Sequence, residues 1–526
     1  MLFRTFGAGL CGTDGFPVCC EADVENGFPQ ISFIGSLSQS VRESSDRVRT
    51  AIANTGIRLE PRHVTISLSP GDVRKEGCAY DLPVAAALLG AYGYLPDTLT
   101  EDSLFAGELS LSGKILPVNG IISMVSAARD AGLARCFLPM ENLREGSVVK
   151  GISCYGISSL PELLDLLTGS TPLPEPAVYE DPPYEKLQLH GFSGIRGQEL
   201  AKRATLLAAG GRHNILYIGP AGTGKTMLAS RLPSILPAMT TEERLELTRI
   251  YSISGLLDEK EPFIRRRPFR SLHHTITPQA LSGGGKVPVP GEVSLAHHGI
   301  LFLDELPEFR TGALDILRQP LEEKQIHISR VSGSVTFPAS FQLVCAMNPC
   351  RCGFWPDRER CRCSELQVRS YISRISKPLL DRIDICVETV PVSFGDLSSR
   401  PEEDSFRQLC GRVEEVRQIQ AERFRGSGIY FNSEMSPSQI ETFCPLPSKE
   451  KDFLKTVYEN SGMSARALHK ILRVARTAAD LAGVRDIRHE DLCEAIAFRS
   501  LENKYWSTAP EAARIRRKYH DRQKQK

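Results

Sequence analysis

The sequence predicts an α/β protein in which a core with a mostly parallel sheet lies between a mixed α/β domain and a helical domain. Residues 219–226 read Gly-Pro-Ala-Gly-Thr-Gly-Lys-Thr, which fits the pattern Gly-x-x-x-x-Gly-Lys-[Ser/Thr]. Apolar strand patterns alternate with helix patterns around this octapeptide over residues 189–400. From residue 401 onward the patterns are helical.

Length and composition limit the classes of protein to consider. The chain has 526 residues, enough for about three domains. Its formal net charge is +1, so any basic surface must be local. We expect no membrane span and no signal peptide, because no long apolar run is present. One cluster of four among the 15 cysteines favours a reduced, cytoplasmic protein over a disulfide scaffold.

The first 170 residues read as the mixed α/β domain. Residues 64–68 alternate like a strand, and residues 82–89 read as a helix that tolerates Pro83 in its first turn. Residues 171–188 are rich in proline, which predicts a stiff interdomain linker.

The C-terminal part reads as a helical domain over residues 401–510. One helix is expected to run from Ser464 toward Gly483, a typical C-terminal stop. Residues 511–526 form a basic tail.

The octapeptide predicts a phosphate-binding loop, because an apolar strand at 215–218 precedes it and a helix follows it. Glycines let the backbone N–H groups point inward, and the helix N-terminus adds positive partial charge. Lys225 can then reach the β- and γ-phosphates, and the Thr226 hydroxyl can hold Mg²⁺. The alternative, an ordinary glycine-rich turn, is disfavoured by these flanks. The candidate phosphate contacts are Gly219, Pro220, Ala221, Gly222, Thr223, Gly224, Lys225 and Thr226.

A second apolar strand, at 301–303, ends in two carboxylates. Asp304 can join Thr226 in the Mg²⁺ shell, and Glu305 can orient and deprotonate an attacking water. About 80 residues after a phosphate loop, this pair predicts the second half of a nucleoside triphosphate site.

Three further polar residues allow two readings each. Asn348 follows an apolar strand and can position water near the γ-phosphate, or can simply form a turn before Pro349. Arg382 lies between two carboxylates, which is also typical of a salt-bridged surface. Arg466 begins a helix and can contact phosphate or remain solvated.

Taken in order, these motifs resemble those of the AAA+ ATPases. Arg-Pro-Phe-Arg at 267–270, His-His-Thr at 273–275, three glycines at 283–285 and Pro-Gly-Glu-Val-Ser-Leu-Ala-His at 290–297 resemble the magnesium chelatase-like AAA+ family, ComM/YifB type. This resemblance covers nearly the whole chain. It implies an AAA+ P-loop NTPase core with a C-terminal helical lid, the cofactors ATP and Mg²⁺, and a hexameric ring.

The resemblance also implies roles for the three ambiguous residues. Arg382 becomes the arginine finger inserted into a neighbour's site, Asn348 the sensor-1 residue and Arg466 the sensor-2 arginine. Whether Arg466 acts in its own subunit or in the next stays open. An arginine inserted by a neighbouring subunit can raise the rate of hydrolysis ~10³–10⁵-fold. Insertion into a neighbour requires a head-to-tail interface, which closes into a ring. By itself, the sequence implies only an oligomer.

The N-terminal domain resembles the proteolytic domain of Lon, a ribosomal S5 domain 2-like fold, most clearly at residues 107–120. Ala79 stands where Lon has its nucleophilic serine, and the lysine base falls on Ile122 or Met124. Without a base a nucleophile is not activated, so we expect no peptidase activity. Cys78 is a possible substitute nucleophile, although a buried cysteine is the commoner case.

The cysteine cluster lies in a short polar loop at residues 350–363. Cys350, Cys352, Cys361 and Cys363 can close a tetrahedral Zn²⁺ shell, although C-x-C spacing is tighter than usual. The alternative is a reduced surface loop that binds nothing. The arginines of this loop can also contact nucleic acid; they are Arg351, Arg358, Arg360 and Arg362.

Other candidate DNA contacts are residues 265–267 with Arg270, His273 and His274, the hairpin-like segment 324–330, and the basic tail. Each is more often a solvated face. The resemblance implies an ATP-driven DNA motor, a helicase or branch-migration factor in recombination and uptake of transforming DNA. Two alternatives are a chelatase-type motor acting through a protein partner, and a protein-remodelling ATPase whose Lon-like domain is a docking module.

Overall fold

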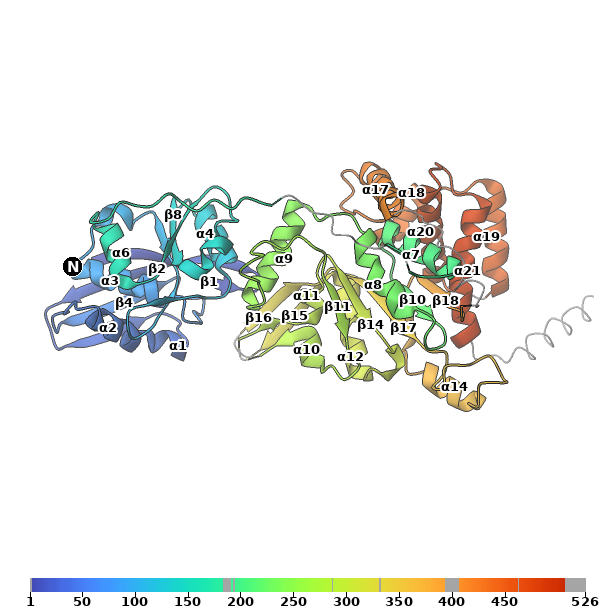
Figure 1. Ribbon diagram of the computed structural model, residues 1–526, viewed down its shortest axis with the longest axis horizontal. Helices are drawn as coiled ribbons and strands as arrows, with labels where there is room; N and C mark the ends of the chain where they lie inside the picture. The colour runs from blue at the N-terminus through green and yellow to red at the C-terminus, as the bar shows by residue number, and fades with distance from the viewer. Residues whose placement is uncertain are drawn as a thin grey trace, which may run out of the picture.

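A computed structural model describes residues 2–182, 191–192, 194–285, 287–330, 333–392, 406–461 and 463–506. The chain forms an elongated molecule in which an N-terminal α/β domain, a central α/β core and a helical region follow one another (Figure 1). The last part of the expected linker and the whole basic tail lie outside the described residues. The exact domain boundaries remain predictions.

The N-terminal domain is built on a seven-stranded mixed sheet with the order β3-β4-β2-β1-β5-β8-β9. Its strands are β1 (Leu2–Cys11), β2 (Asp14–Glu25), β3 (Gln30–Ile34), β4 (His63–Ser69), β5 (Ser103–Phe105), β8 (Arg135–Pro139) and β9 (Ser153–Ile157), with a small separate pair β6 (Glu108–Leu109) and β7 (Ile115–Leu116). Its helices are α1 (Gln39–Arg42), α2 (Ser44–Asn54), α3 (Asp81–Ala91), α4 (Ile121–Asp130), α5 (Leu143–Gly146) and α6 (Leu160–Leu167).

Two predictions for this domain are confirmed. Strand β4 alternates buried and half-buried residues, as its sequence requires. Helix α3 is buried along its whole length, because its sequence is apolar on every side. Pro83 lies in the first turn of α3, where no intrahelical N–H bond is lost.

The core contains a five-stranded sheet with the order β11-β14-β17-β10-β18, and every neighbouring pair is parallel. The strands are β10 (Ile215–Ile218), β11 (Phe269–Leu272), β14 (Ile300–Leu303), β17 (Gln342–Met347) and β18 (Ile385–Glu388). Every residue of β10, β14 and β17 is buried, as expected for a sheet covered on both faces. The predicted parallel sheet is confirmed, and the carboxyl ends of its strands share one edge.

The core helices are α7 (Glu199–Gly211), α8 (Lys225–Ile235), α9 (Thr241–Ile253), α10 (Pro278–Ser282), α11 (Glu292–Leu295), α12 (Thr311–Ile316), α13 (Arg318–Glu323), α14 (Glu365–Ile372) and α15 (Lys377–Leu380). Two β-hairpins accompany them, formed by β12 (Gly283–Gly284) with β13 (Val289–Pro290) and by β15 (Gln325–Arg330) with β16 (Gly333–Pro338). The hairpin expected at 324–330 is therefore present.

The helical region contains α17 (Phe406–Arg423), α18 (Pro437–Phe443), α19 (Ser448–Ser461), α20 (Ala465–Leu481) and α21 (His489–Trp506). The expected ends of α20 are confirmed. The Ser464 side chain accepts a hydrogen bond from the Ala467 N–H, and Gly483 follows the helix with φ of 68°. Within the described ranges, every helix is too short or too polar to cross a bilayer.

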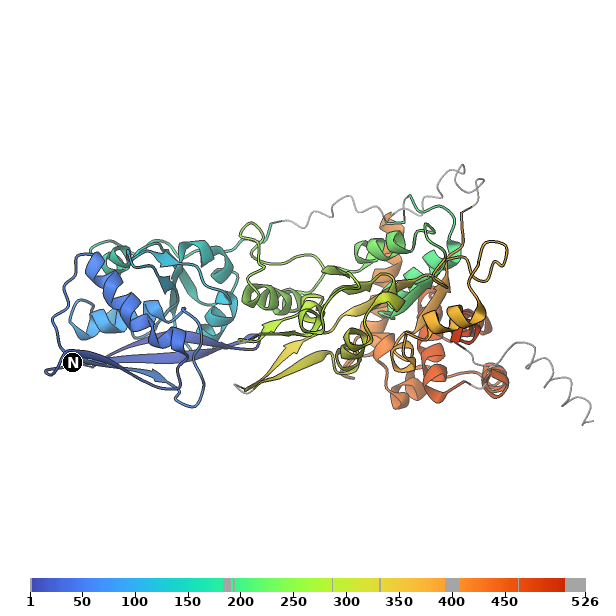
Figure 2. The same ribbon diagram turned by 90° about the horizontal axis from the view of Figure 1, so that it is seen from below.

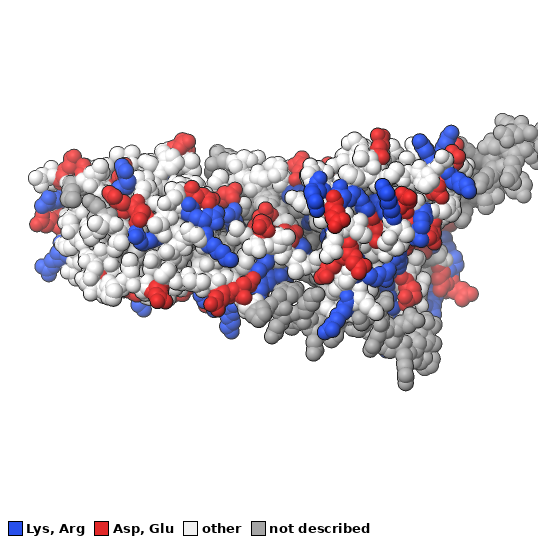
Figure 3. Space-filling model, turned by 90° about the horizontal axis from the view of Figure 1, so that it is seen from above, with Lys and Arg blue, Asp and Glu red and all other residues white. Residues whose placement is uncertain are grey.

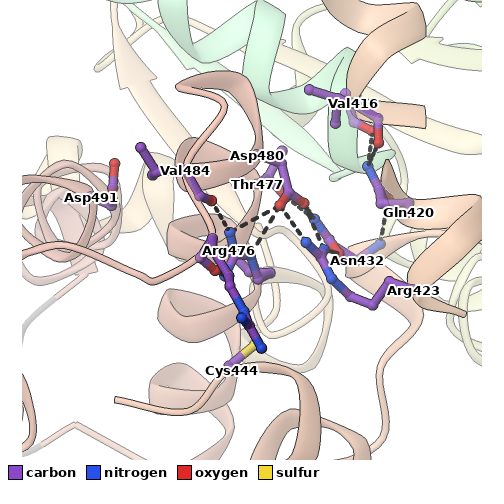
Figure 4. A network of polar contacts seen from close by, with 12 residues as sticks. Val416, Gln420, Arg423, Asn432, Cys444, Arg476, Thr477, Asp480, Val484 and Asp491 are labelled. Atoms are coloured by element: carbon purple, nitrogen blue, oxygen red, sulfur yellow. Dashed lines mark hydrogen bonds and ion pairs between the residues drawn. The ribbon is translucent and has the colours of Figure 1, made fainter. Parts of the chain in front are cut away.

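A buried polar network fixes the lid helices to one another and to the core (Figure 4). The Asp480 carboxylate on α20 accepts hydrogen bonds from Arg423 on α17, from Asn432 and from Arg476. Gln420 of α17 donates to the Gly210 carbonyl at the end of α7, at 2.9 Å. Because each buried polar group of this network has a partner, the lid is held in one orientation on the core.

The N-terminal domain contacts the core through helices and through a hairpin tip. Helix α4 packs against α9, and the buried Glu145 carboxylate accepts a hydrogen bond from the Ser252 hydroxyl of α9. The tip of the β1–β2 hairpin reaches the β15–β16 hairpin (Figure 2), where a Cβ at Gly12 would lie 3.0 Å from the Thr336 carbonyl oxygen.

We predict that Asp480→Ala loosens the lid. The substitution leaves buried guanidinium groups without their carboxylate, which typically costs about 3–5 kcal/mol. Amide hydrogen exchange along α20 measures the free energy of local opening. Asp486→Ala is a matched control, because Asp486 is exposed, and should change that free energy by less than about 0.5 kcal/mol. Equal exchange in both variants would show that the network adds nothing to lid stability.

Candidate functional site

The phosphate loop leaves β10 through a contact that only glycine permits. A Cβ at Gly219 would lie 2.2 Å from Thr389 Oγ1 and 2.3 Å from the Thr389 carbonyl oxygen. Gly222 and Gly224 have φ of 78° and 84°, the left-handed conformation that glycine adopts without strain. The glycines of the motif are therefore required by backbone geometry.

Two side chains that sequence reasoning missed hold this loop in place. Thr389, just after β18, has its hydroxyl 2.7 Å from that of Thr223. Gln198, before α7, donates to the Thr223 carbonyl at 3.3 Å and to the Val390 carbonyl at 2.5 Å. No local pattern marks these residues, because they reach the loop only through the tertiary fold.

The Lys225 ammonium group lies inside the loop. It donates to the carbonyl oxygens of Gly219 at 2.8 Å and Pro220 at 2.7 Å, and to Asn348 Oδ1 at 3.0 Å. Burial lowers the pKa of Lys225 to about 8, while Asp304 and Glu305 act in the opposite direction. The structure thus joins the loop lysine to the amide that ends β17.

The Thr226 hydroxyl donates to Asp304 Oδ2 at 2.8 Å, which joins the start of α8 to the end of β14. Glu305 has φ of 53°, a strained conformation for a residue other than glycine, and such strain is concentrated at functional sites. Its Oε2 lies 3.7 Å from His274 Nδ1. Hydroxyl and carboxylate oxygens are ligands that Mg²⁺ prefers, so Thr226 and Asp304 fit this ion.

Arg382 and Arg466 do not approach the phosphate loop of their own chain. The Arg382 carbonyl accepts a hydrogen bond from the side chain of Asn214, which directly precedes β10. The phosphate loop follows the other end of β10, ~13 Å away for four residues of strand. The Arg382 guanidinium contacts Glu322 Oε1 and the Pro378 carbonyl, both at 2.5 Å, and Arg466 is exposed.

Both arginines line one cavity of about 460 Å³ at the amino edge of the sheet. Helix α20 contributes Arg466, Lys470 and Arg473, which share one helix face. Burial lowers the pKa of Lys470 to about 8. The other charged residues that line this cavity are Arg212, Lys324, Glu322, Asp381, Asp384 and Glu434.

The four cysteine thiols of segment 350–363 come together. All four Sγ atoms lie within 4.8 Å of one another. The Sγ of Cys350 is 3.3 Å from that of Cys352 and 3.8 Å from that of Cys361, and the last two are 3.5 Å apart. A tetrahedral shell with Zn–S bonds of ~2.3 Å has sulfur–sulfur separations of ~3.8 Å, so these distances fit zinc.

Glu246, His297 and His298 also cluster, but hydrogen bonding makes His297 a poor metal ligand. The Ser340 N–H donates to His297 Nδ1 at 3.0 Å, so the ring proton sits on Nε2, which points to Glu246 Oε2 at 3.1 Å. His298 Nε2 lies 2.8 Å from the same oxygen. These hydrogen bonds lower the pKa of Glu246 and connect α9 to the residues that precede β14.

Several of the candidate DNA contacts are involved in internal ion pairs, most closely Arg267 and Arg270. Arg267 contacts Glu243 and the His298 carbonyl, and Arg270 forms a bidentate pair with Glu292 at 2.7 Å. The interpretation of these two residues as a free basic surface is therefore wrong. Positive and negative side chains are interspersed over the face seen in Figure 3. The exposed face of the β15–β16 hairpin carries His327.

The positions that match the Lon catalytic residues form an apolar cluster. Ala79, Ile122 and Met124 are buried together in the N-terminal domain. Burial and the neighbouring Glu108 raise the pKa of the Cys78 thiol, which disfavours the nucleophilic thiolate. The expected absence of peptidase activity stays a prediction.

Three family models match successive parts of the chain: "Subunit ChlI of Mg-chelatase" at residues 20–142, "Magnesium chelatase, subunit ChlI" at 191–397, and "Magnesium chelatase, subunit ChlI C-terminal" at 403–499.

The chain is 38% identical over 494 residues to the competence protein ComM of Haemophilus influenzae, covering 92% of this chain and 94% of ComM. It is 38% identical over 493 residues to YifB of Escherichia coli, covering 93% and 96% of the two chains. A Lon protease of Syntrophomonas wolfei is 29% identical over 171 residues, which covers 30% of this chain and 21% of the protease. With its P-loop and parallel five-stranded core, the chain belongs to the magnesium chelatase-like AAA+ family of the ComM and YifB type.

Proposed function

We propose that this protein is an ATP-hydrolysing motor that remodels DNA as a helicase or branch-migration factor. The observation that carries ATP hydrolysis is the meeting of Lys225, Thr226, Asp304, Glu305 and Asn348 at the carboxyl edge of one parallel sheet. In open α/β sheets this edge is where ligands bind. The family implies ATP and Mg²⁺ as substrate and cofactor.

The proposed roles follow from these positions. Backbone N–H groups of residues 221–224 and the Lys225 ammonium group hold the phosphates, and Thr226 and Asp304 hold Mg²⁺, which offsets developing charge. Glu305 accepts the proton of the attacking water, and Asn348 orients that water. The contact between Lys225 and Asn348 supports these roles, because it brings the amide that follows β17 to the loop lysine.

We propose a head-to-tail ring, hexameric by the family resemblance, in which Arg382 and Arg466 act on the neighbouring subunit's nucleotide. Both arginines lie at the amino edge of the sheet, away from their own phosphate loop. A heterologous interface brings the amino edge of one copy to the carboxyl edge of the next, and successive contacts close into a ring.

DNA as the target is supported by the relative named competence protein ComM and by the exposed β15–β16 hairpin. The names of the three family models favour a second candidate, a chelatase-type motor that acts through a protein partner. In either case we expect the Lon-like domain to lack peptidase activity, because the positions that match the Lon catalytic residues are apolar. The proposed metals are Mg²⁺ at the phosphate loop and structural zinc at the cysteine cluster.

We expect branched DNA to stimulate the ATPase rate, and more strongly at low than at high salt because phosphate contacts release counterions. Glu305→Gln removes the proton acceptor and should lower turnover ~10²–10⁴-fold while ATP still binds. Steady-state ATPase assays on the wild-type protein and on Glu305→Gln, each at two salt concentrations, measure these effects. Rates that are flat on every DNA form, but that rise with a protein partner, would support the chelatase-type alternative.

Nucleotide affinity should fall as the pH rises through about 8. In the nucleotide-free protein the pKa of Lys225 is lowered to about 8. Bound phosphates favour the charged form of Lys225. Because Lys225 loses its proton above this pH in the free protein, nucleotide affinity should fall by up to about tenfold per pH unit. Titration calorimetry with a non-hydrolysable ATP analogue should also detect proton uptake. In Lys225→Arg the guanidinium stays charged, so nucleotide affinity should not change with pH over this range. If the affinity of this variant fell with pH as steeply as in the wild type, Lys225 would not be the cause of the pH dependence.

Mixing two inactive variants tests the shared site. Arg382→Ala chains retain Glu305, and Glu305→Gln chains retain Arg382, so an equal mixture should recover about a quarter of wild-type turnover at the interfaces that combine both intact groups. Each variant alone at the same total concentration is the control. No recovery in mixed oligomers, verified by native mass spectrometry, would mean that Arg382 does not act across the interface.

A further inference from the structure

We propose that zinc bound by Cys350, Cys352, Cys361 and Cys363 is a structural brace of the nucleotide site, and that ATP binding depends on it. This inference rests on the proposed function and adds a metal requirement to the same site. The reason lies in what the cysteine loop touches on either side.

On one side the cysteine loop lies against the nucleotide site. Cys350 comes two residues after Asn348, and its side chain is fully buried in the same apolar cluster as the end of β17. At Gly353, with φ of 84°, a Cβ would lie 3.7 Å from the Ala221 backbone nitrogen. The loop between the cysteines therefore contacts the phosphate loop directly.

On the other side the cysteine loop contacts the lid. The Trp355 ring lies 5.3 Å from the Tyr505 ring of α21. The Tyr505 hydroxyl donates to Glu388 at 2.5 Å, and Glu388 directly precedes Thr389, which contacts Gly219. The cysteine loop thus connects the phosphate loop, the end of β17 and helix α21 of the lid.

Residues 350–363 contain no helix or strand. Turns shape the loop, with backbone hydrogen bonds from Gly353 to Cys350, from Asp357 to Phe354 and from Cys361 to Asp357. The Asp357 side chain also accepts hydrogen bonds from the backbone of residues 359 and 360. A metal bonded to four thiolates would cross-link both ends of the segment, and binding free energy of such sites is directly folding free energy.

The charge of the loop also fits a metal–thiolate centre. Zn²⁺ with four thiolates carries two net negative charges, and the segment contains four arginines. Arg358 donates to the Cys363 carbonyl at 3.4 Å, so at least one of them lies directly beside the cluster. The segment also contains Asp357 and Glu359, so its formal net charge of +2 would balance that of the centre. Arg358 and Arg360 further pair with Glu365 and Asp357.

The experiment uses the full chain purified without chelator. Wild type should contain about one zinc per chain by elemental analysis. Cys352→Ser/Cys361→Ser should contain almost none and should bind a non-hydrolysable ATP analogue about tenfold or more weakly. Cys493→Ser, at an exposed cysteine outside the cluster, is the matched control and should behave as wild type. Removal of zinc from the wild-type protein with a strong chelator should weaken analogue binding by the same factor, and addition of zinc should restore it. This second measurement tests the proposal even if the cysteine variant does not fold.

Near-zero zinc in the wild type would overturn the metal site, and unchanged analogue affinity in zinc-free protein would overturn the brace. Failure of the proposed function gives a different result. Zinc-dependent analogue binding without hydrolysis would support the brace and contradict the motor. Full hydrolysis by zinc-free protein would support the motor and contradict the brace.

Discussion

The candidate site depends on the close approach of the phosphate loop to the end of β18. At Gly219 the backbone passes so near Thr389 that no side chain fits, and Thr389 also bonds to Thr223 inside the loop. Once the loop is fixed there, Lys225 reaches Asn348 and Thr226 reaches Asp304. These contacts are possible because parallel strands that are far apart in the sequence all end at one edge of the sheet.

The two edges of this sheet carry different groups. Carboxylates, a hydroxyl and the phosphate loop lie at the carboxyl edge, and a cavity lined by arginine, lysine and carboxylate side chains lies at the amino edge. The proposed shared nucleotide site requires that these two edges of neighbouring copies meet. The buried network around Asp480 matters here, because it sets the position of α20, and with it Arg466, relative to the sheet.

Helix α9 connects the N-terminal domain to the same sheet. One end contacts Glu145 through Ser252, and Glu246 farther along the helix holds His297 and His298, just before β14. Asp304 directly follows β14. The Lon-like domain is thus joined through packed side chains to the strand that carries the acidic pair, although its own catalytic positions are apolar.

The sequence by itself determined the elements whose signals are local. The glycines of 219–224, the acidic pair after an apolar strand, and the ends of α20 at Ser464 and Gly483 each follow from backbone conformation or hydrogen bonding over a few residues. The parallel sheet was also expected from the apolar strands that precede Gly219, Asp304 and Asn348, whereas β11 and β18 were not predicted individually.

Only the tertiary structure decided which distant side chains meet. Gln198 and Thr389 form hydrogen bonds with the phosphate loop. Arg267 and Arg270 pair with glutamates of the same chain. The cysteine loop contacts Ala221. None of these contacts leaves a periodic or local signal, because a side chain's partner across a sheet depends on strand order and on the packing of the whole core. Local patterns specify what a segment can form, and packing selects what it touches.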